Sequence, residues 1–276
     1  MKNMTLIKPS LAFTILAISS LSNAQMPFDP YASIVINSSG LQPGIYGNAS
    51  AALGKPTTWI RDTINGGTDQ KLRAGLTYGA WNTAPNGTPL IVTIPAGGQI
   101  TLAFKRPIFD DPKNFFGKDF IVFGNSFLAS NLSYTASVNP FSISILGGPD
   151  FLEPMQVSVS PDLLNWHSFP ISNTTAADSL WPTQAFRWDS ALGGFGEESD
   201  FSRPVHPDLT RANFTGKSLP QAVELYQNSG GGTAFDLAET GFKWIKYIRI
   251  TGNGGEIDAI SRVKPQVKTV TSPISP

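Results

Sequence analysis

The chain has 276 residues, and its 20 basic and 20 acidic side chains balance. Charged residues make up only 14% of the chain, and cysteine is absent. The charge balance gives no electrostatic attraction to nucleic acid or to an anionic membrane, and the lack of cysteine excludes a disulfide framework. A chain of this length is long enough to bury a real hydrophobic core without such cross-links.

The first 24 residues have the pattern of a secretory signal. Lys2 and Lys8 precede an apolar run over 11–21, which is too short to span a bilayer, and Ser22 and Ala24 are small residues before a cleavage point. Removing the two lysines leaves 18 basic against 20 acidic residues, a net charge of −2. We expect a secreted, extracellular or cell-surface protein, with the periplasm as the alternative location and no transmembrane segment.

Short strand-like runs dominate the rest of the chain. Several alternate apolar with polar residues, and each is bounded by Gly, Pro, Asn or Asp. They cover 90–94, 99–104, 119–123, 141–146, 155–160 and 244–250. Between 172 and 223 the alternation disappears, and a weak helix is expected only at about 218–227. The pattern predicts one all-β domain over 25–266, a two-sheet antiparallel β-sandwich with a long loop insertion, followed by a flexible tail over 267–276.

One hairpin carries a resemblance to a known fold. In the segment 156–169, Pro161 and Asp162 supply a turn between two strands. A strand ending in Val-x-Val-Ser before an Asp-x-x-x-Trp turn resembles discoidin-type, galactose-binding-like β-sandwiches. Taken in chain order with the segments at 117–125, 234–238 and 256–260, it is similar to a family of secreted bacterial "cell surface proteins" over roughly 51–263. The resemblance implies a jelly-roll sandwich. Because carbohydrate-binding sandwiches of this shape often bind structural calcium through an acidic residue of the last strand, it also implies that Asp258 is such a ligand.

Acidic residues near expected strand ends predict a cation site. Glu256 and Asp258 stand two positions apart on the last expected strand, so both would share one face. Neighbouring carboxylates repel unless a cation, a proton or a donor lies between them, and Ca²⁺ prefers six to eight oxygen ligands. The expected ligands of a structural calcium ion are Asp119, Asn125, Asp236, Glu256 and Asp258. The alternative, in which the aspartates cap turns and hold backbone amides, stays open.

The catalytic patterns are incomplete, so no enzymatic activity is expected. The motif at 256–260 is followed by Ser261, where a laminarinase-like glycosidase needs a second glutamate as acid/base. Serine cannot replace a carboxylic acid as the proton donor at neutral pH. The alternative is a polysaccharide-acting glycoside hydrolase that uses carboxylates of the insertion, Glu197 and Glu198, or Glu256 of the last strand.

Aromatic side chains point to ligand binding. Trp166 and Trp244 lie in strand patterns and are expected in the core, whereas two other tryptophans lie in the irregular insertion. Sugars bind by stacking their CH faces on such rings, with polar groups beside them. The expected ligand-binding residues are Trp181, Arg187, Trp188 and Asp189. The predicted function is a non-enzymatic secreted or cell-surface binding module, calcium-stabilised, that recognises a glycan or another envelope component. A structural adhesion or matrix module is a further alternative.

Overall fold

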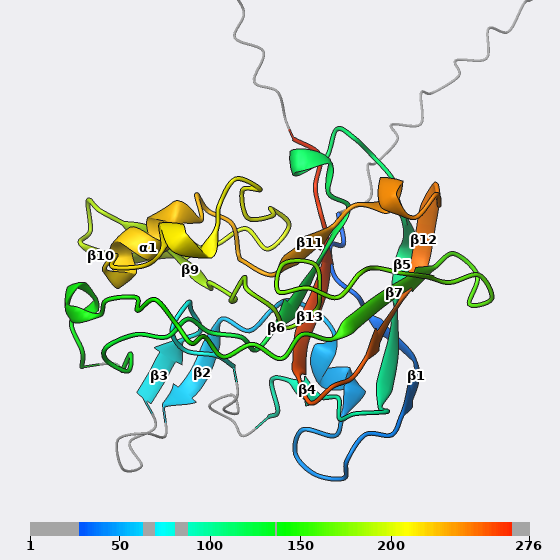
Figure 1. Cartoon of the computed structure of the whole chain (residues 1–276), viewed down its shortest axis with the longest axis horizontal. Helices are drawn as coiled ribbons and strands as arrows, with labels where there is room; N and C mark the ends of the chain where they lie inside the picture. The colour runs from blue at the N-terminus through cyan, green and yellow to red at the C-terminus, as the bar shows by residue number, and fades with distance from the viewer. Residues whose placement is uncertain (1–27, 63–69, 81–87, 136, 267–276) are drawn as a thin grey trace, which may run out of the picture.

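The computed structural model describes residues 28–62, 70–80, 88–135 and 137–266, so the expected signal segment and tail lie outside the described residues. The fold is all-β, with antiparallel sheets packed into a sandwich (Figure 1). One sheet has the strand order β1-β5-β12-β7-β8 and the other has the order β11-β6-β13-β4. The predicted all-β sandwich is confirmed, and its finer jelly-roll, galactose-binding-like connectivity stays a prediction.

The strands of the two sheets come from distant parts of the chain. The five-stranded sheet contains β1 (Ile34–Ser39), β5 (Gln99–Phe109), β12 (Trp244–Thr251), β7 (Gln156–Ser160) and β8 (His167–Ser168). The four-stranded sheet contains β11 (Thr233–Phe235), β6 (Phe120–Gly124), β13 (Glu256–Arg262) and β4 (Val92–Thr93). All pairings within both sheets are antiparallel.

The four-stranded sheet is buried on both faces. Phe120 and Val122 of β6 belong to the core between the two sheets, while Ile121 and Phe123 belong to a second core on the opposite face. This burial explains why β6 is a continuous apolar run instead of an alternating one, since a sheet covered on both sides has no solvent face.

The second core draws its residues from several segments, and the insertion at 172–223 supplies part of them. It is covered by two hairpins, one short helix and several 3-10 turns. These elements are β2 (Trp59–Asp62), β3 (Gln70–Arg73), β9 (Phe186–Asp189), β10 (Gly194–Glu198), α1 (Leu219–Leu225), η2 (Phe115–Gly117), η3 (Pro140–Ser142) and η4 (Arg211–Asn213). Two further 3-10 turns, η1 (Ala49–Ala52) and η5 (Leu237–Glu239), pack instead against the core between the two sheets. The predicted irregular loop is therefore a packed layer, which Figure 1 shows beside the sandwich. Its apolar residues contact the sheet across long sequence distances, so no local periodicity marks them.

Several element predictions are confirmed and some are wrong. The runs at 99–104, 119–123, 155–160 and 244–250 form β5, β6, β7 and β12, and the predicted helix forms α1. The strand predicted at 141–146 is wrong. The Asn139 side chain accepts a hydrogen bond from the Phe141 amide at 3.0 Å and thereby caps the start of η3.

The expectation that Trp166 and Trp244 lie in the core is wrong, because neither residue belongs to either core. Trp244 is 39% exposed. Trp166 is partly exposed and lies beneath the Arg249 guanidinium, which is 3.7 Å from the ring centroid. A cation stacked on a ring allows an aromatic side chain to stay at the surface with one face covered.

Candidate functional site

A β-bulge in β13 separates Glu256 from Asp258, although their spacing of two residues predicts that both lie on one face of the strand. Ile257 is paired with Gly124 and Ala259 with Phe123, so Asp258 is the extra residue between them. A bulge of this kind re-aims the side chains that follow it. Ile257 and Ala259 accordingly belong to opposite cores, although two residues of a regular strand at this spacing would share a face.

Glu256 lies in a cavity of about 310 Å³ at the junction of β6 and β13 with two loops. We call it the acidic cavity. Its walls are Asn125, Ser126, Phe127, Asp150, Phe151, Leu152, Glu153, Asp178 and Glu256. Carboxylate oxygens of Glu153, Asp178 and Glu256 all lie within 4.8 Å of one another. Asp150 is paired with Arg211, so its charge is already compensated. The other three carboxylates form the acidic group of the site.

Asp178 connects the two strands at the base of the cavity. Its Oδ1 accepts a hydrogen bond from the Asn125 amide at 2.7 Å, and its Oδ2 accepts one from the Glu256 amide at 2.9 Å. The residue is 2% exposed and has a φ of 51°. Glycine permits this approach, because a Cβ added at Gly124 would lie 2.4 Å from the Asp178 Cα, and one at Gly255 would lie 2.9 Å from its Oδ2.

The carboxyls of the acidic cavity are strongly perturbed. Burial raises the pKa of Asp178 to about 7, against the opposing hydrogen bonds from the Glu256 and Asn125 amides. Burial, followed by the charge of Asp178 and contact with Glu153, raises the pKa of Glu256 to about 8. Perturbed carboxyls in a cavity make it a candidate functional site, and carboxylates this close together need a proton or a cation between them.

The groups that line the acidic cavity could hold a hard cation such as calcium. Among the described residues, the buried Oδ1 of Asn125 has no hydrogen-bond partner, and Asn125 lies beside Asp178. Three carboxylates and an amide oxygen are hard ligands of the kind that Ca²⁺ prefers. Asn125 and Glu256 were expected as ligands from the sequence, whereas Glu153 and Asp178 were not.

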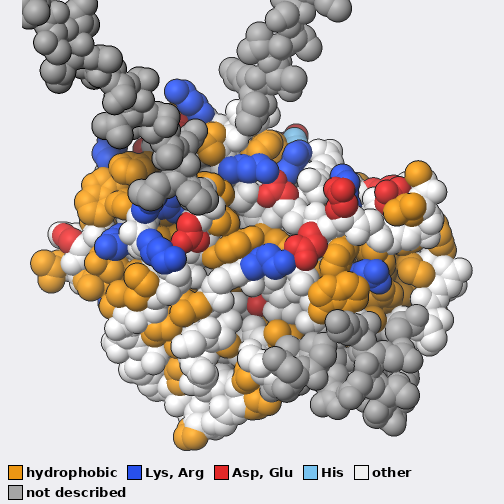
Figure 2. Space-filling model, turned by 180° about the vertical axis from the view of Figure 1, so that it is seen from behind, with side chains coloured by type: hydrophobic (Ala, Val, Ile, Leu, Met, Phe, Trp, Pro, Cys, Tyr) orange, Lys and Arg blue, Asp and Glu red, His pale blue; other side chains and the backbone are white. Residues whose placement is uncertain are grey.

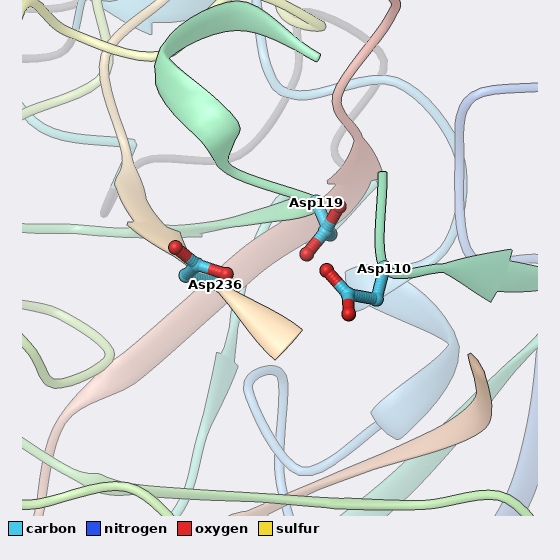
Figure 3. A group of neighbouring side chains, drawn as sticks. All are labelled: Asp110, Asp119 and Asp236. Atoms are coloured by element: carbon cyan, nitrogen blue, oxygen red, sulfur yellow. The ribbon is translucent and has the colours of Figure 1, made fainter. Parts of the chain in front are cut away.

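A second acidic group has a structural explanation. Asp110, Asp119 and Asp236 converge from three segments (Figure 3), with oxygens within 4.8 Å of one another. Asp119 is fully buried, and its carboxylate accepts hydrogen bonds from the Asp111 amide at 3.0 Å and from the Leu237 amide at 2.8 Å. Burial raises the pKa of Asp119, while these hydrogen bonds oppose the shift. Asp119 therefore holds two turns against the sheet.

The outer members of this second group are paired with lysines. Lys118 lies 4.0 Å from Asp236, and Lys243 lies 3.9 Å from Asp110. Asp236 also caps η5, because its Oδ1 accepts a hydrogen bond from the Ala238 amide at 2.9 Å. These contacts agree with the open alternative in which the aspartates hold backbone amides. We therefore place the candidate cation site at the acidic cavity.

Asp258 belongs to neither acidic group among the described residues. It is 2% exposed, and both of its oxygens accept hydrogen bonds from Thr57, one from the amide and one from the hydroxyl, each at 2.8 Å. Burial raises the pKa of Asp258 to about 7. The structure therefore gives Asp258 a different environment from that of Glu256.

The four residues expected to bind ligand lie in two places. Trp181 lines a cavity of about 370 Å³ together with Phe116 and Phe235. The other three residues are on β9 and do not line this cavity. Arg187 pairs with Glu197, Asp189 accepts turn hydrogen bonds from the amides of residues 191 and 192, and Trp188 packs at 5.3 Å against both Phe141 and Phe195. These contacts hold the β9–β10 hairpin together.

Part of the acidic cavity carries no local sequence signal. Glu153 and Asp178 are isolated acids in loops, and Phe127 and Phe151 are isolated aromatics, so only tertiary contacts bring them together. No family model, curated protein or solved structure matches the chain. Within the described residues, no helix is both long enough and apolar enough to cross a membrane.

Proposed function

We propose that this protein is a binding module of the cell exterior that recognises a glycan at the acidic cavity. The observation that supports the proposal most is the aromatic pair on the cavity wall. Phe127 and Phe151 stack with ring centroids 4.2 Å apart and planes inclined by 21°. Phe151 is 60% exposed, although it has a partner to pack against. Both rings line the same cavity as the three carboxylates.

This combination suits a sugar better than other ligands. A sugar presents CH faces, which pack on an aromatic ring, and hydroxyl groups, which donate to carboxylates. On the face shown in Figure 2, acidic and basic side chains lie interspersed and much of the surface is uncharged. This face has no large area of one sign that would attract a polyanion or a polycation.

Calcium is part of the proposal. Glu153, Asp178 and Glu256 would hold the ion, with Asn125 as an amide ligand. The bound ion would neutralise the mutual repulsion of the carboxylates and keep them ionised at neutral pH. Without it, the raised pKa values of Asp178 and Glu256 keep protons in the cavity near neutral pH. We therefore expect glycan binding to weaken in EDTA.

The first test is a glycan array on residues 25–276, in calcium and in EDTA. For any glycan found, Phe151→Ala is expected to weaken binding about fivefold to tenfold, because one sugar-stacking ring is lost. The matched control is Phe109→Ala, since Phe109 is also 60% exposed but lies at the end of β5 and outside the acidic cavity. Equal loss in both variants, or no glycan on the array in either buffer, would contradict the proposal.

A glycoside hydrolase is the second candidate, and one observation favours it. Carboxylate oxygens of Glu153 and Glu256 lie within 4.8 Å of each other, and the pKa of Glu256 is raised to about 8. Retaining glycosidases place their two carboxyls about 5 Å apart, with one of them protonated. The discriminating measurement is release of reducing ends from polysaccharides. We expect none from the unmodified protein, whereas a hydrolase would show turnover that Glu153→Gln and Glu256→Gln each abolish.

A further inference from the structure

A second cavity, of about 470 Å³, lies around Asp258. We call it the Asp258 cavity. Its walls are formed by the chain around η1, by the start of β2 and by the segment before β4: Asn48, Ser50, Ala51, Leu53, Lys55, Pro56, Thr57, Thr58, Trp59, Thr88, Pro89, Leu90 and Asp258. None of these residues lines the acidic cavity. The bulge in β13 thus puts Glu256 and Asp258 on the walls of two separate cavities.

Asp258 keeps unused hydrogen-bonding capacity. Among the described residues, its two oxygens accept one hydrogen bond each, both from Thr57. A carboxylate has about four lone-pair sites, so about two remain for other donors. Because the side chain is 2% exposed yet lines the cavity, those sites are available to a group that enters the cavity. Donors from a bound ligand would compensate part of the cost of burying this carboxyl.

The Asp258 cavity has little net charge. Its lysine, Lys55, is held by Glu198 of β10, with distances from Nζ to the two carboxylate oxygens of 3.0 and 2.8 Å. The acidic group of the wall is the single carboxylate of Asp258, whose oxygens already accept hydrogen bonds from Thr57. A charged ligand would have to give up its hydration for a site of weak opposite charge, which disfavours ions.

The remaining wall groups are a fixed aromatic ring and small polar side chains. Trp59 is held by the edge of Phe186, with centroids 5.0 Å apart, and by the Arg73 guanidinium, 4.8 Å from the ring centroid. Ser50 and Thr58 add hydroxyl groups that donate and accept. A fixed ring beside groups of both hydrogen-bonding types matches a molecule with both apolar CH faces and hydroxyls.

From this geometry we infer that the Asp258 cavity is a second binding site, and that its ligand is a neutral saccharide unit. The sugar hydroxyls donate to the free lone pairs of Asp258, and a CH face of the ring packs against Trp59. This inference does not depend on the ligand of the acidic cavity, because the two cavities share no residue. Together with the proposed function, it gives the chain two saccharide sites, one in the Asp258 cavity and one in the acidic cavity.

The test is a protein-observed NMR titration of residues 25–276 with four trisaccharides: maltotriose, cellotriose, laminaritriose and chitotriose. The backbone amides of 55–59 and the Trp59 indole report on the Asp258 cavity, and the amides of 125–127 report on the acidic cavity. We expect saturable shifts at 55–59 with at least one trisaccharide, in the millimolar range that suits a single small site. The absence of such shifts with all four would overturn the inference.

Two variants and one control locate the binding. Asp258→Asn removes one acceptor and is expected to weaken binding at 55–59 about tenfold. Ser50→Trp fills the mouth of the cavity from an exposed position, so it is expected to abolish these shifts without disturbing the core. Glu153→Gln in the acidic cavity is the control and should leave them unchanged. Shifts at 55–59 that survive Ser50→Trp, or that disappear in Glu153→Gln, would overturn the inference.

A separate titration compares a cationic ligand with the neutral sugars at the Asp258 cavity. Methylammonium is the probe for a cationic ligand, because a lone carboxylate beside an aromatic ring also suits an ammonium group. We expect it to cause no saturable shift at 55–59. Shifts with methylammonium and none with the sugars would overturn the saccharide assignment. Failure of the proposed glycan function would appear separately, as the absence of shifts at 125–127.

Discussion

Asp178→Ala is expected to lower the free energy of unfolding by about 2 to 5 kcal/mol, one of the largest effects of any polar substitution in this chain. The reason is that the partly buried amides of Asn125 and Glu256 both lose the buried carboxylate that accepts their hydrogen bonds, and an unsatisfied N–H away from water costs about 1 to 3 kcal/mol. The measurement is equilibrium unfolding in urea, with EDTA present so that metal binding does not contribute.

Asp162→Ala is the matched control for this substitution. Asp162 also accepts hydrogen bonds from two backbone amides, those of Leu164 and Asn165, but it does so at an exposed turn where water can replace it. A much smaller loss of stability is expected there. Asp178→Asn keeps an acceptor for one of the two amides and should give an intermediate value. If Asp178→Ala cost no more than Asp162→Ala, Asp178 would not be the structural link between β6 and β13.

The stability of the metal-free protein is expected to fall by several kcal/mol between pH 5 and pH 8.5. Burial raises the pKa of Asp178 and of Asp258 to about 7, and burial together with neighbouring carboxyls raises that of Glu256 to about 8. In the unfolded chain these groups titrate near pH 4, so the folded state binds more protons across this interval. The stabilisation is complete below the unfolded pKa values and is lost as the pH rises through the folded ones, by about 1.4 kcal/mol per pH unit for each group.

Urea unfolding at a series of pH values in EDTA measures this dependence, and calcium provides a second arm. At pH 8 calcium is expected to restore much of the lost stability, whereas at pH 5 protons already neutralise the cavity and calcium should add little. Asp258→Asn is the control, because it should reduce the pH slope without changing the calcium effect. Stability that rises between pH 5 and 8.5, or a calcium effect independent of pH, would contradict this account.

Local patterns were enough to predict most of the sandwich. Alternating apolar and polar residues over 99–104, 155–160 and 244–250 predict strands, because successive side chains of a strand point to opposite faces. The 141–146 run shows the limit of this reasoning. The same alternation there begins within a 3-10 turn, since Pro140 and the capping side chain of Asn139 favour a turn locally.

The candidate site was predicted only in part. Asn125 and Glu256 were expected as cation ligands and lie in the acidic cavity, while Glu153 and Asp178 join them from loops without any pattern. Contacts between residues far apart in the sequence depend on how the loops pack, which neither periodicity nor spacing reports. The stacked ring of Phe151 was missed for the same reason.

The sequence by itself determined the class of this protein: a cysteine-free chain of alternating strands that folds into an antiparallel β-sandwich. Only the tertiary structure decided where its chemistry lies. The clearest case is the pair Glu256 and Asp258, which the two-residue period of a strand places on one face. The bulge in β13 arises from how β13 pairs with β6, and a pairing irregularity of one residue leaves no trace in the local sequence. That single residue sends the two carboxylates into different cavities.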